Sequence, residues 1–207
     1  MKICKNDIIL FQGDSVTDCG RDRGNPNGLG DGYVSVISKI LKEEFSDYNL
    51  TIYNRGVSGN RAADLRLRWQ RDCIDLKPTI VTILIGINDV WRRYDANHIT
   101  SAESFERSYR KILQKVKGEL GAKIVMMEPF VNPFPDDRKA WREDLDPKLE
   151  VVRKLAKEFK ADLISLDEIF AKAYDANLPD HYAYDGVHPT PAGHELIAKS
   201  WLEKLEN

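Results

Sequence analysis

The sequence has few cysteines, no long hydrophobic run and no surplus of charge of one sign. Its three cysteines, Cys4, Cys19 and Cys73, are odd in number and scattered along the chain. This usage is typical of reduced thiols in a cytoplasmic protein, and it disfavours both a disulfide framework and a zinc site. We therefore expect a cytoplasmic location.

Positive and negative charges nearly balance, because 31 lysines and arginines accompany 33 aspartates and glutamates. Without a basic block, neither nucleic acid nor an anionic membrane is expected as a partner. The first apolar run, residues 8–11, is far shorter than the core of a signal peptide, and no run is long enough to span a bilayer. No metal or other cofactor is expected, since the early aspartates have no histidine or cysteine at ligand spacing.

What the sequence does contain is an alternation of short β-branched runs with stretches of helical period. The predicted strands are residues 8–11, 51–54, 79–85, 123–127 and 162–166. This pattern predicts right-handed βαβ units and a parallel sheet covered on both faces, within a single domain over residues 1–207. Residues 128–147 form a long, proline-broken connection, which is typical of a functional rim, with a plain surface excursion as the alternative.

Polar turns that contain glycine follow the first three predicted strands, at residues 13–15, 54–60 and 86–89. In a doubly wound sheet, ligands bind beyond the carboxyl ends of the strands, so we expect these turns to converge. Ser15, in the first turn, could be a nucleophile, but serine after a strand is also a common turn or cap residue. A phosphate loop is excluded, because no Gly-Lys-Ser/Thr follows the first strand.

A serine hydroxyl is a weak nucleophile until a base accepts its proton. Two of the four histidines, His98 and His188, follow an aspartate by three residues, Asp95 and Asp185 respectively. At this spacing a carboxylate can orient the ring, so spacing alone leaves both pairs open. Context favours His188, because it precedes Pro189 and is therefore held extended. His194 falls inside the predicted terminal helix and is expected to be structural or on the surface, and His181 has no obvious orienting acid.

Acyl transfer also needs hydrogen-bond donors for the oxyanion that develops on the substrate. The three turns offer the N–H of Ser15, a glycine N–H after the second strand, and the side-chain amide of Asn88. Each of these groups is weak evidence by itself. However, each lies at the end of a predicted strand, and their order along the chain is compatible with a single site. Together they favour nucleophilic chemistry.

Four stretches, "GDSVTDCG", "NRGVSGN", "IGINDVW" and "DGVHPTPAGH", resemble in order and spacing the four sequence blocks of the SGNH (GDSL-type) hydrolases. The resemblance implies a flavodoxin-like three-layer α/β/α fold with a five-stranded parallel sheet. It also implies that Ser15 is the nucleophile, His188 the base and Asp185 its orienting acid. The implied oxyanion hole consists of Ser15 N–H, Gly56 N–H and the side chain of Asn88.

The longer strings around the first three blocks are most similar to intracellular carbohydrate acetylesterases, especially acetylxylan esterases. This resemblance implies a serine esterase that removes O-acetyl groups from xylo-oligosaccharides or related plant-derived sugars. Flat rings stack on sugar faces, and guanidinium and amide groups bind hydroxyls. The expected substrate-binding residues are Asp14, Arg55, Asn60, Trp91 and Tyr184. Tyr94 and Trp141 are expected on the same aromatic rim.

Two other hypotheses stay open. The same chemistry would serve an SGNH lipase, lysophospholipase, thioesterase or acyltransferase, although no long apolar stretch near the predicted site indicates a groove for a fatty acyl chain. A non-enzymatic sugar- or acyl-binding module is the other, but a binder needs no base, orienting acid and oxyanion donors together. A homo-oligomer is compatible with the sequence, which does not determine the number of copies.

Overall fold

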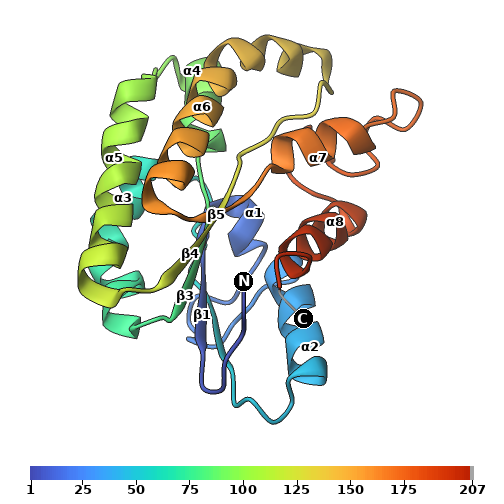
Figure 1. The fold of residues 1–207 in the computed structure, drawn as a ribbon. Helices are drawn as coiled ribbons and strands as arrows, with labels where there is room; N and C mark the ends of the chain where they lie inside the picture. The colour runs from blue at the N-terminus through green and yellow to red at the C-terminus, as the bar shows by residue number, and fades with distance from the viewer. Residues whose placement is uncertain (206–207) are drawn as a thin grey trace.

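A five-stranded parallel sheet forms the centre of the computed structural model, which describes residues 1–205 (Figure 1). Its strands lie in the order β2-β1-β3-β4-β5. They are β1 (Ile8–Gly13), β2 (Thr51–Asn54), β3 (Ile80–Leu84), β4 (Lys123–Met127) and β5 (Asp162–Ile164). The five predicted strands and their parallel pairing are confirmed.

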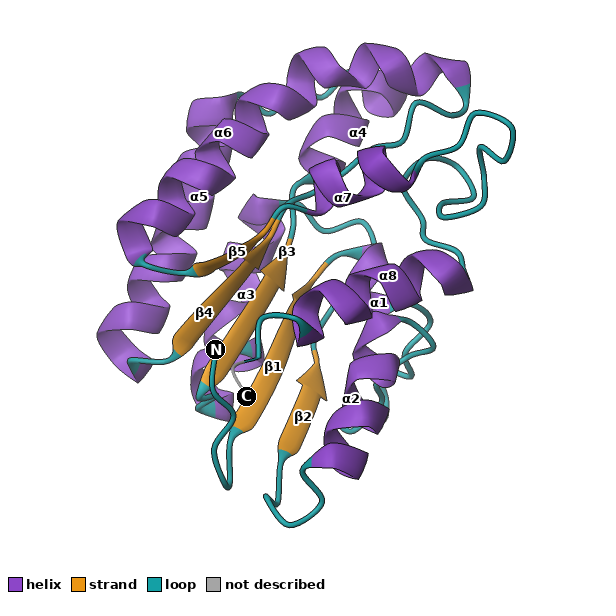
Figure 2. Ribbon diagram, turned by 45° about the vertical axis from the view of Figure 1, so that its right-hand side comes forward, coloured by secondary structure: helices purple, strands orange, loops and turns teal. Residues whose placement is uncertain are grey.

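Helices cover both faces of this sheet, which gives the three layers that were expected (Figure 2). One face carries α2 (Tyr33–Glu44), α7 (Leu166–Ala173) and α8 (Pro191–Leu202). The other carries α3 (Ala62–Asp72), α5 (Ala102–Lys115) and α6 (Arg142–Phe159). Two further helices, α1 (Ser15–Asp18) and α4 (Ile87–Ala96), begin just beyond the carboxyl ends of β1 and β3.

The sheet is buried on both faces because successive side chains of a strand point in opposite directions. In β1, Phe11 packs against Tyr33 and Trp201 of the α2–α8 layer, with ring centroids 5.8 and 5.4 Å away. Its neighbour Leu10 belongs to the core under α3 and α5. Two separate hydrophobic cores therefore hold β1 and the turn that follows it.

The strand order determines where a ligand can bind. The chain leaves β1 toward β2 on one side, and it leaves β3 toward β4 on the other side. In this flavodoxin-like order, a crevice opens at the point between β1 and β3 where the direction of winding reverses. Ser15 follows β1, and Asn88 lies in the first turn of α4 after β3, so both reach this crevice.

The long connection after β4 ends earlier than predicted. A 3₁₀ segment occupies Asp136–Trp141, and α6 begins directly after it at Arg142. Pro147 therefore lies inside the helix, and the prediction that the loop extends to residue 147 is wrong at this end. Leu145 and Leu149 recur at helical spacing and are buried, so their packing outweighs the backbone hydrogen bond that the proline removes.

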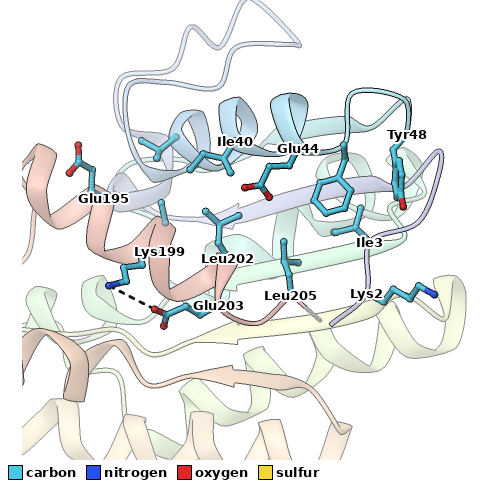
Figure 3. A pocket seen from close by; sticks show the side chains of 13 residues that line it. Lys2, Ile3, Ile40, Glu44, Tyr48, Glu195, Lys199, Leu202, Glu203 and Leu205 are labelled. Carbon is cyan, nitrogen blue, oxygen red and sulfur yellow. Dashed lines mark ion pairs between the residues drawn. The ribbon is translucent and has the colours of Figure 1, made fainter. Parts of the chain in front are cut away.

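A hollow of about 860 Å³ lies between α2, α8 and the residues before β1 (Figure 3). Its lining is mixed, with Ile40 and Leu202 beside Glu44 and the ion pair Lys199–Glu203. This hollow is at the amino end of β1, whereas Ser15 follows the carboxyl end of the same strand. None of the helices in residues 1–205 has the length and apolar character needed to cross a bilayer.

Candidate active site

The structure brings Ser15, His188 and Asp185 into one line, although Ser15 and His188 are 173 positions apart. Ser15 Oγ lies 3.0 Å from His188 Nε2, and His188 Nδ1 lies 2.8 Å from Asp185 Oδ2. A carboxylate only accepts hydrogen bonds, so Nδ1 carries the ring proton and donates it to Asp185. His188 Nε2 is then free to accept the proton of the serine hydroxyl.

A tight turn holds the acid and the base of this line together. Asp185 Oδ1 accepts hydrogen bonds from the N–H groups of Val187 and His188 at 3.0 and 2.8 Å. Gly186, between them, has a φ of +84°, and a Cβ there would come within 2.3 Å of the carbonyl oxygen of Phe134. Only glycine fits this position of the turn between Asp185 and His188.

Each member of the pair shifts the pKa of the other. Burial disfavours the Asp185 charge, but hydrogen bonds from the His188 side chain and backbone outweigh it and lower the Asp185 pKa to about 2. The hydrogen bond to Asp185 in turn raises the pKa of His188 above 6.5. Asp185 is therefore ionised at neutral pH and can stabilise the imidazolium that a general base becomes.

Ser15 is positioned by the two residues before it. A Cβ on Gly13 would lie 2.4 Å from the carbonyl oxygen of Leu84, so glycine permits the sharp exit from β1. Asp14 caps α1 by accepting a hydrogen bond from Val16 N–H at 3.1 Å. Asp14 is only 1% exposed, so the prediction that it binds substrate is wrong. Burial raises the pKa of this carboxyl to about 7.

Gly56 does not offer the free N–H that was predicted. Its N–H donates to Asn54 Oδ1 at 2.8 Å, and its carbonyl accepts from Arg21 Nε at 3.0 Å. A Cβ at this position would lie 2.3 Å from the backbone nitrogen of Asp18. Gly56 is therefore a packing residue that lets the turn after β2 press against α1, and its predicted place in the oxyanion hole is wrong.

The second glycine of "NRGVSGN", Gly59, has the property that Gly56 lacks. Within residues 1–205, its N–H has no acceptor, and it is exposed at a φ of +83° beside open space. Every other backbone N–H from residue 55 to residue 61 is paired. The acceptors lie in Phe11 for Arg55, Asn54 for Gly56, Gly13 for Val57, Asp18 for Ser58, Val57 for Asn60 and Asp64 for Arg61.

Asn88 joins this turn to α4. Its Nδ2 donates to the carbonyl oxygen of Asn60 at 3.2 Å, next to Gly59, and one amide hydrogen remains for another acceptor. Ser15 begins α1, so its own N–H has no acceptor within the helix. Three unpaired donors, from Ser15, Gly59 and Asn88, therefore come from the ends of three different strands.

Two of the predicted substrate-binding residues border the triad. The Trp91 ring lies 5.6 Å from the His188 ring, and Tyr184, which is 61% exposed, directly precedes Asp185. Trp141 is only 1% exposed, so the expectation that it forms part of the open rim is wrong. Instead it supports Tyr94, which stacks on it at 5.1 Å and is partly exposed.

The other two predicted substrate-binding residues lie on the α3 side of the site. Arg55 donates to the carbonyl oxygens of Pro26 and Asn54, and Asn60 Oδ1 accepts from Arg68 Nε at 2.7 Å. Both residues line a hollow of about 700 Å³ that is rich in arginine. They are therefore near the turn that carries Gly59, but their polar atoms are largely occupied by the protein itself.

Arg138 is a functional candidate that the sequence reasoning missed. Its guanidinium lies over the rings of Trp141 and Trp91, at 4.1 and 4.9 Å, and its Nε donates to the carbonyl oxygen of Asp185 at 3.1 Å. Asn132 N–H donates to Gly186 in the same turn at 2.8 Å. The connection after β4 thus supports the catalytic turn directly. Only its tertiary contacts reveal this role.

The remaining histidines do not compete for the role of base. His98 and His181 are exposed and lie outside the line of Ser15. His194 is buried in α8, where its Nδ1 accepts from Tyr33 N–H at 3.2 Å, and burial lowers its pKa to about 4. Of the two positions expected for His194, packed or on the surface, the structure shows the packed one. In residues 1–205 no three His, Cys, Asp or Glu side chains are grouped so as to hold a metal ion.

A hydroxyl, an imidazole and a carboxylate joined in this order are the arrangement of serine hydrolases. The chain belongs to the GDSL-like lipase/acylhydrolase family, whose sequence profile matches residues 11–196. It is therefore a carboxylic ester hydrolase, and the resemblance seen in its four sequence blocks is confirmed.

Relatives of nearly the same length support this assignment. The acetylxylan esterase of Geobacillus stearothermophilus is 34% identical, over 99% of this chain and 96% of the relative. The crystal structure of Axe2, an acetylxylan esterase from that organism, matches with a TM-score of 0.87 over 98% of this chain and 95% of its own, at 34% identity. LAE5, an alpha/beta hydrolase enzyme from the metagenome of Lake Arreo, Spain, also gives 0.87, at 29% identity over 97% and 95% of the two chains.

Proposed function

We propose that this protein removes O-acetyl groups from acetylated xylo-oligosaccharides or closely related sugars, with Ser15 as nucleophile. The observation that carries the mechanism is the hydrogen-bonded line from Ser15 Oγ through His188 to Asp185, at 3.0 and 2.8 Å. The substrate is supported by the near full-length similarity to the acetylxylan esterase of Geobacillus stearothermophilus.

In the first half of the reaction, Ser15 Oγ attacks the acetyl carbonyl carbon while His188 Nε2 takes its proton. The tetrahedral oxyanion accepts hydrogen bonds from Ser15 N–H, Gly59 N–H and Asn88 Nδ2. Each such donor typically contributes about 10²–10³ in rate. The carbon–oxygen bond to the sugar then breaks, and His188 returns the proton to the leaving sugar oxygen. An acetyl group remains on Ser15.

In the second half, a water molecule replaces the sugar. His188 takes a proton from the water, whose oxygen attacks the acetyl carbon, and the same donors hold the second oxyanion. Collapse of this intermediate releases acetate and returns the proton to Ser15. Two catalytic mutants of Axe2 replace an aspartate and a histidine three positions apart, which is the spacing of Asp185 and His188.

At the rim, Trp91 and Tyr184 contact the sugar in this proposal, which is supported by their flat rings and by their positions beside His188 and Asp185. A cytoplasmic location completes the proposal. It is supported by the three free cysteines, of which Cys4 is exposed, Cys19 partly exposed and Cys73 buried.

The test is acetate release from acetylated xylo-oligosaccharides, compared with hydrolysis of aryl esters from acetate to octanoate. The wild-type enzyme should release acetate and prefer the acetyl ester. Ser15→Ala should abolish turnover without unfolding the protein, whereas Ser35→Ala on α2 should leave it unchanged. Turnover by Ser15→Ala would disprove the mechanism. A preference for octanoate would instead support the lipase or thioesterase alternative.

A further inference from the structure

A hollow of about 360 Å³ lies between α3 and α5, which run side by side on the sheet face opposite to α2 and α8 (Figure 1). The loop that joins α4 to α5 closes one end of it. Its volume is at the lower end of the range for small-molecule pockets, about 300–1,000 Å³. The residues that line it include Arg61, Arg66, Arg107 and Lys111 but a single carboxyl group, that of Asp89.

Of the four arginines and lysines that line this hollow, Arg61 pairs with Asp64, and the other three have no ion pair within residues 1–205. Among residues 1–205, three arginines have no carboxylate oxygen within 4.0 Å, namely Arg55, Arg66 and Arg107, while every other arginine has one. Two of these three line the same hollow. Lys111, on its wall, has no ion pair within the described chain either. On α3 and α5, the basic residues without an ion pair in the part of the chain that the structure describes are therefore Arg66, Arg107 and Lys111, and all three line this hollow.

The rest of the same two helices shows the contrast. On α3, Arg68 and Arg71 both pair with Asp72, and on α5, Arg110 pairs with Glu106 and Glu158. Across the hollow, by contrast, Arg66 of α3 and two cations of α5 line one space in which Asp89 carries the single carboxyl group. Like charges placed together repel one another. A bound anion would convert this repulsion into attraction and would join the two helices.

Neutral donors complete the lining. Thr100, Ser104 and Ser108, each with a hydroxyl group, also line the hollow. Arg107 Nη2 donates to Ser104 Oγ at 2.6 Å, which orients the guanidinium and leaves the hydroxyl hydrogen available to a ligand. Asp89 is buried and accepts from Ala62 N–H at 2.9 Å, so it is committed to the first turn of α3.

We infer that this hollow binds a phosphate-type oxyanion, as inorganic phosphate or as the phosphate group of a small phosphorylated sugar. A single carboxylate offers two oxygens, which one arginine fork can occupy. A phosphate dianion offers enough oxygens to engage forks from Arg66 and Arg107 on the two opposite helices, together with serine hydroxyls. The lining includes none of Ser15, His188 and Asp185, so the proposed site is distinct from the triad, although Arg61 and Asp89 adjoin Asn60 and Asn88 in the sequence.

The inference is tested by calorimetric titration of the full-length protein with inorganic phosphate at constant ionic strength. Charge-assisted hydrogen bonds are strong enough that each of Arg66→Gln and Arg107→Gln should weaken binding by about tenfold or more. Arg71→Gln removes the same charge from α3 outside the hollow, and its Kd should match the wild type. Phosphate should also raise the melting temperature of the wild type, but not that of a variant that carries both Arg66→Gln and Arg107→Gln.

Two further measurements locate the binding site and distinguish free phosphate from a phosphorylated sugar as its ligand. Protein labelled at Ser15 with an organophosphonate should bind phosphate with an unchanged Kd, because the hollow is not the active site. Equal affinity for phosphate and ribose 5-phosphate would identify the free anion as the ligand, and tighter binding of the sugar phosphate would identify the phosphorylated sugar. The inference is wrong if wild-type protein binds no phosphate, if Arg71→Gln weakens binding as much as Arg66→Gln, or if labelling abolishes binding.

Discussion

At the residue scale, activity depends on the protonation state of one imidazole. His188 can accept the serine proton only when it is neutral, and its hydrogen bond to Asp185 raises its pKa above 6.5. The protonated, inactive form therefore persists to a higher pH than it would in an isolated histidine. We expect kcat/KM to rise with pH through this raised pKa.

Asp185→Asn tests the origin of that shift. An amide cannot stabilise the imidazolium, so the pKa of His188 should fall and the acidic limb of the pH–rate profile should move to lower pH. The rate above the limb should fall by about 10²–10⁴, the usual range for loss of general acid–base catalysis. The measurement is kcat/KM against pH, with Asp180→Asn, an exposed acid a few residues earlier, as the control. A limb that stays in place would show that Asp185 does not set this pKa.

At the element scale, the segment between β4 and α6 acts as a support for the catalytic turn. Arg138 links the two by its hydrogen bond to Asp185 and by its contacts with Trp91 and Trp141. Its positive charge also lowers the pKa of His188, in opposition to Asp185. Arg138 is thus a positioning residue whose charge also acts on the pKa of the base.

Arg138→Ala should therefore change catalysis as well as stability. We expect kcat to fall by about tenfold, which corresponds to the loss of one charge-assisted hydrogen bond. The pKa of His188 should rise, because a nearby cation is removed, and the acidic limb should move to higher pH. Lys139→Ala, whose side chain pairs with Asp136 away from the turn, is the matched control. A purely structural role would lower stability and leave the limb where it is.

At the scale of the whole molecule, two buried carboxyl groups beneath the site couple stability to pH. Burial raises the pKa values of Asp14 and Asp89 to about 7 in the folded protein, whereas aspartate in the unfolded chain titrates near 3.8. Between these values the folded protein holds protons that the unfolded chain has released. Stability should therefore fall as pH rises from about 4 to about 7, and these two groups should add no further change above that range.

The contribution of Asp14 can be isolated by comparing Asp14→Asn with the wild type. An asparagine can still cap α1 but does not titrate, so the variant should gain stability relative to the wild type as pH rises from about 4 to 7. The gain should reach about 1.4 kcal/mol for each pH unit at most. Urea unfolding across this range provides the measurement, with Asp180→Asn as the exposed control. A difference that does not change with pH would mean that Asp14 titrates normally.

Part of this molecule could be predicted because the relevant signals are local. Burial of β1 on both faces requires an apolar run, and the parallel sheet places Ser15 and Asn88 at the same edge. The Asp185–His188 pair lies within one turn, so its spacing is visible in the sequence. The end of the loop at Pro147 was misjudged, because the packing of Leu145 and Leu149 outweighs a proline that would break an isolated helix.

The sequence by itself determined the sheet, the order of its turns and the chemical groups at their ends, because these follow from periodicity and short-range spacing. Only the tertiary structure decided which N–H of the turn after β2 is free, since that depends on what Asn54 and α1 already occupy around Gly56. Contacts between distant segments likewise decided that Asp14 and Trp141 are buried and that Arg138 binds the carbonyl oxygen of Asp185. Such contacts leave no mark on local sequence, because hydrogen bonding and burial are settled only when all the elements have packed.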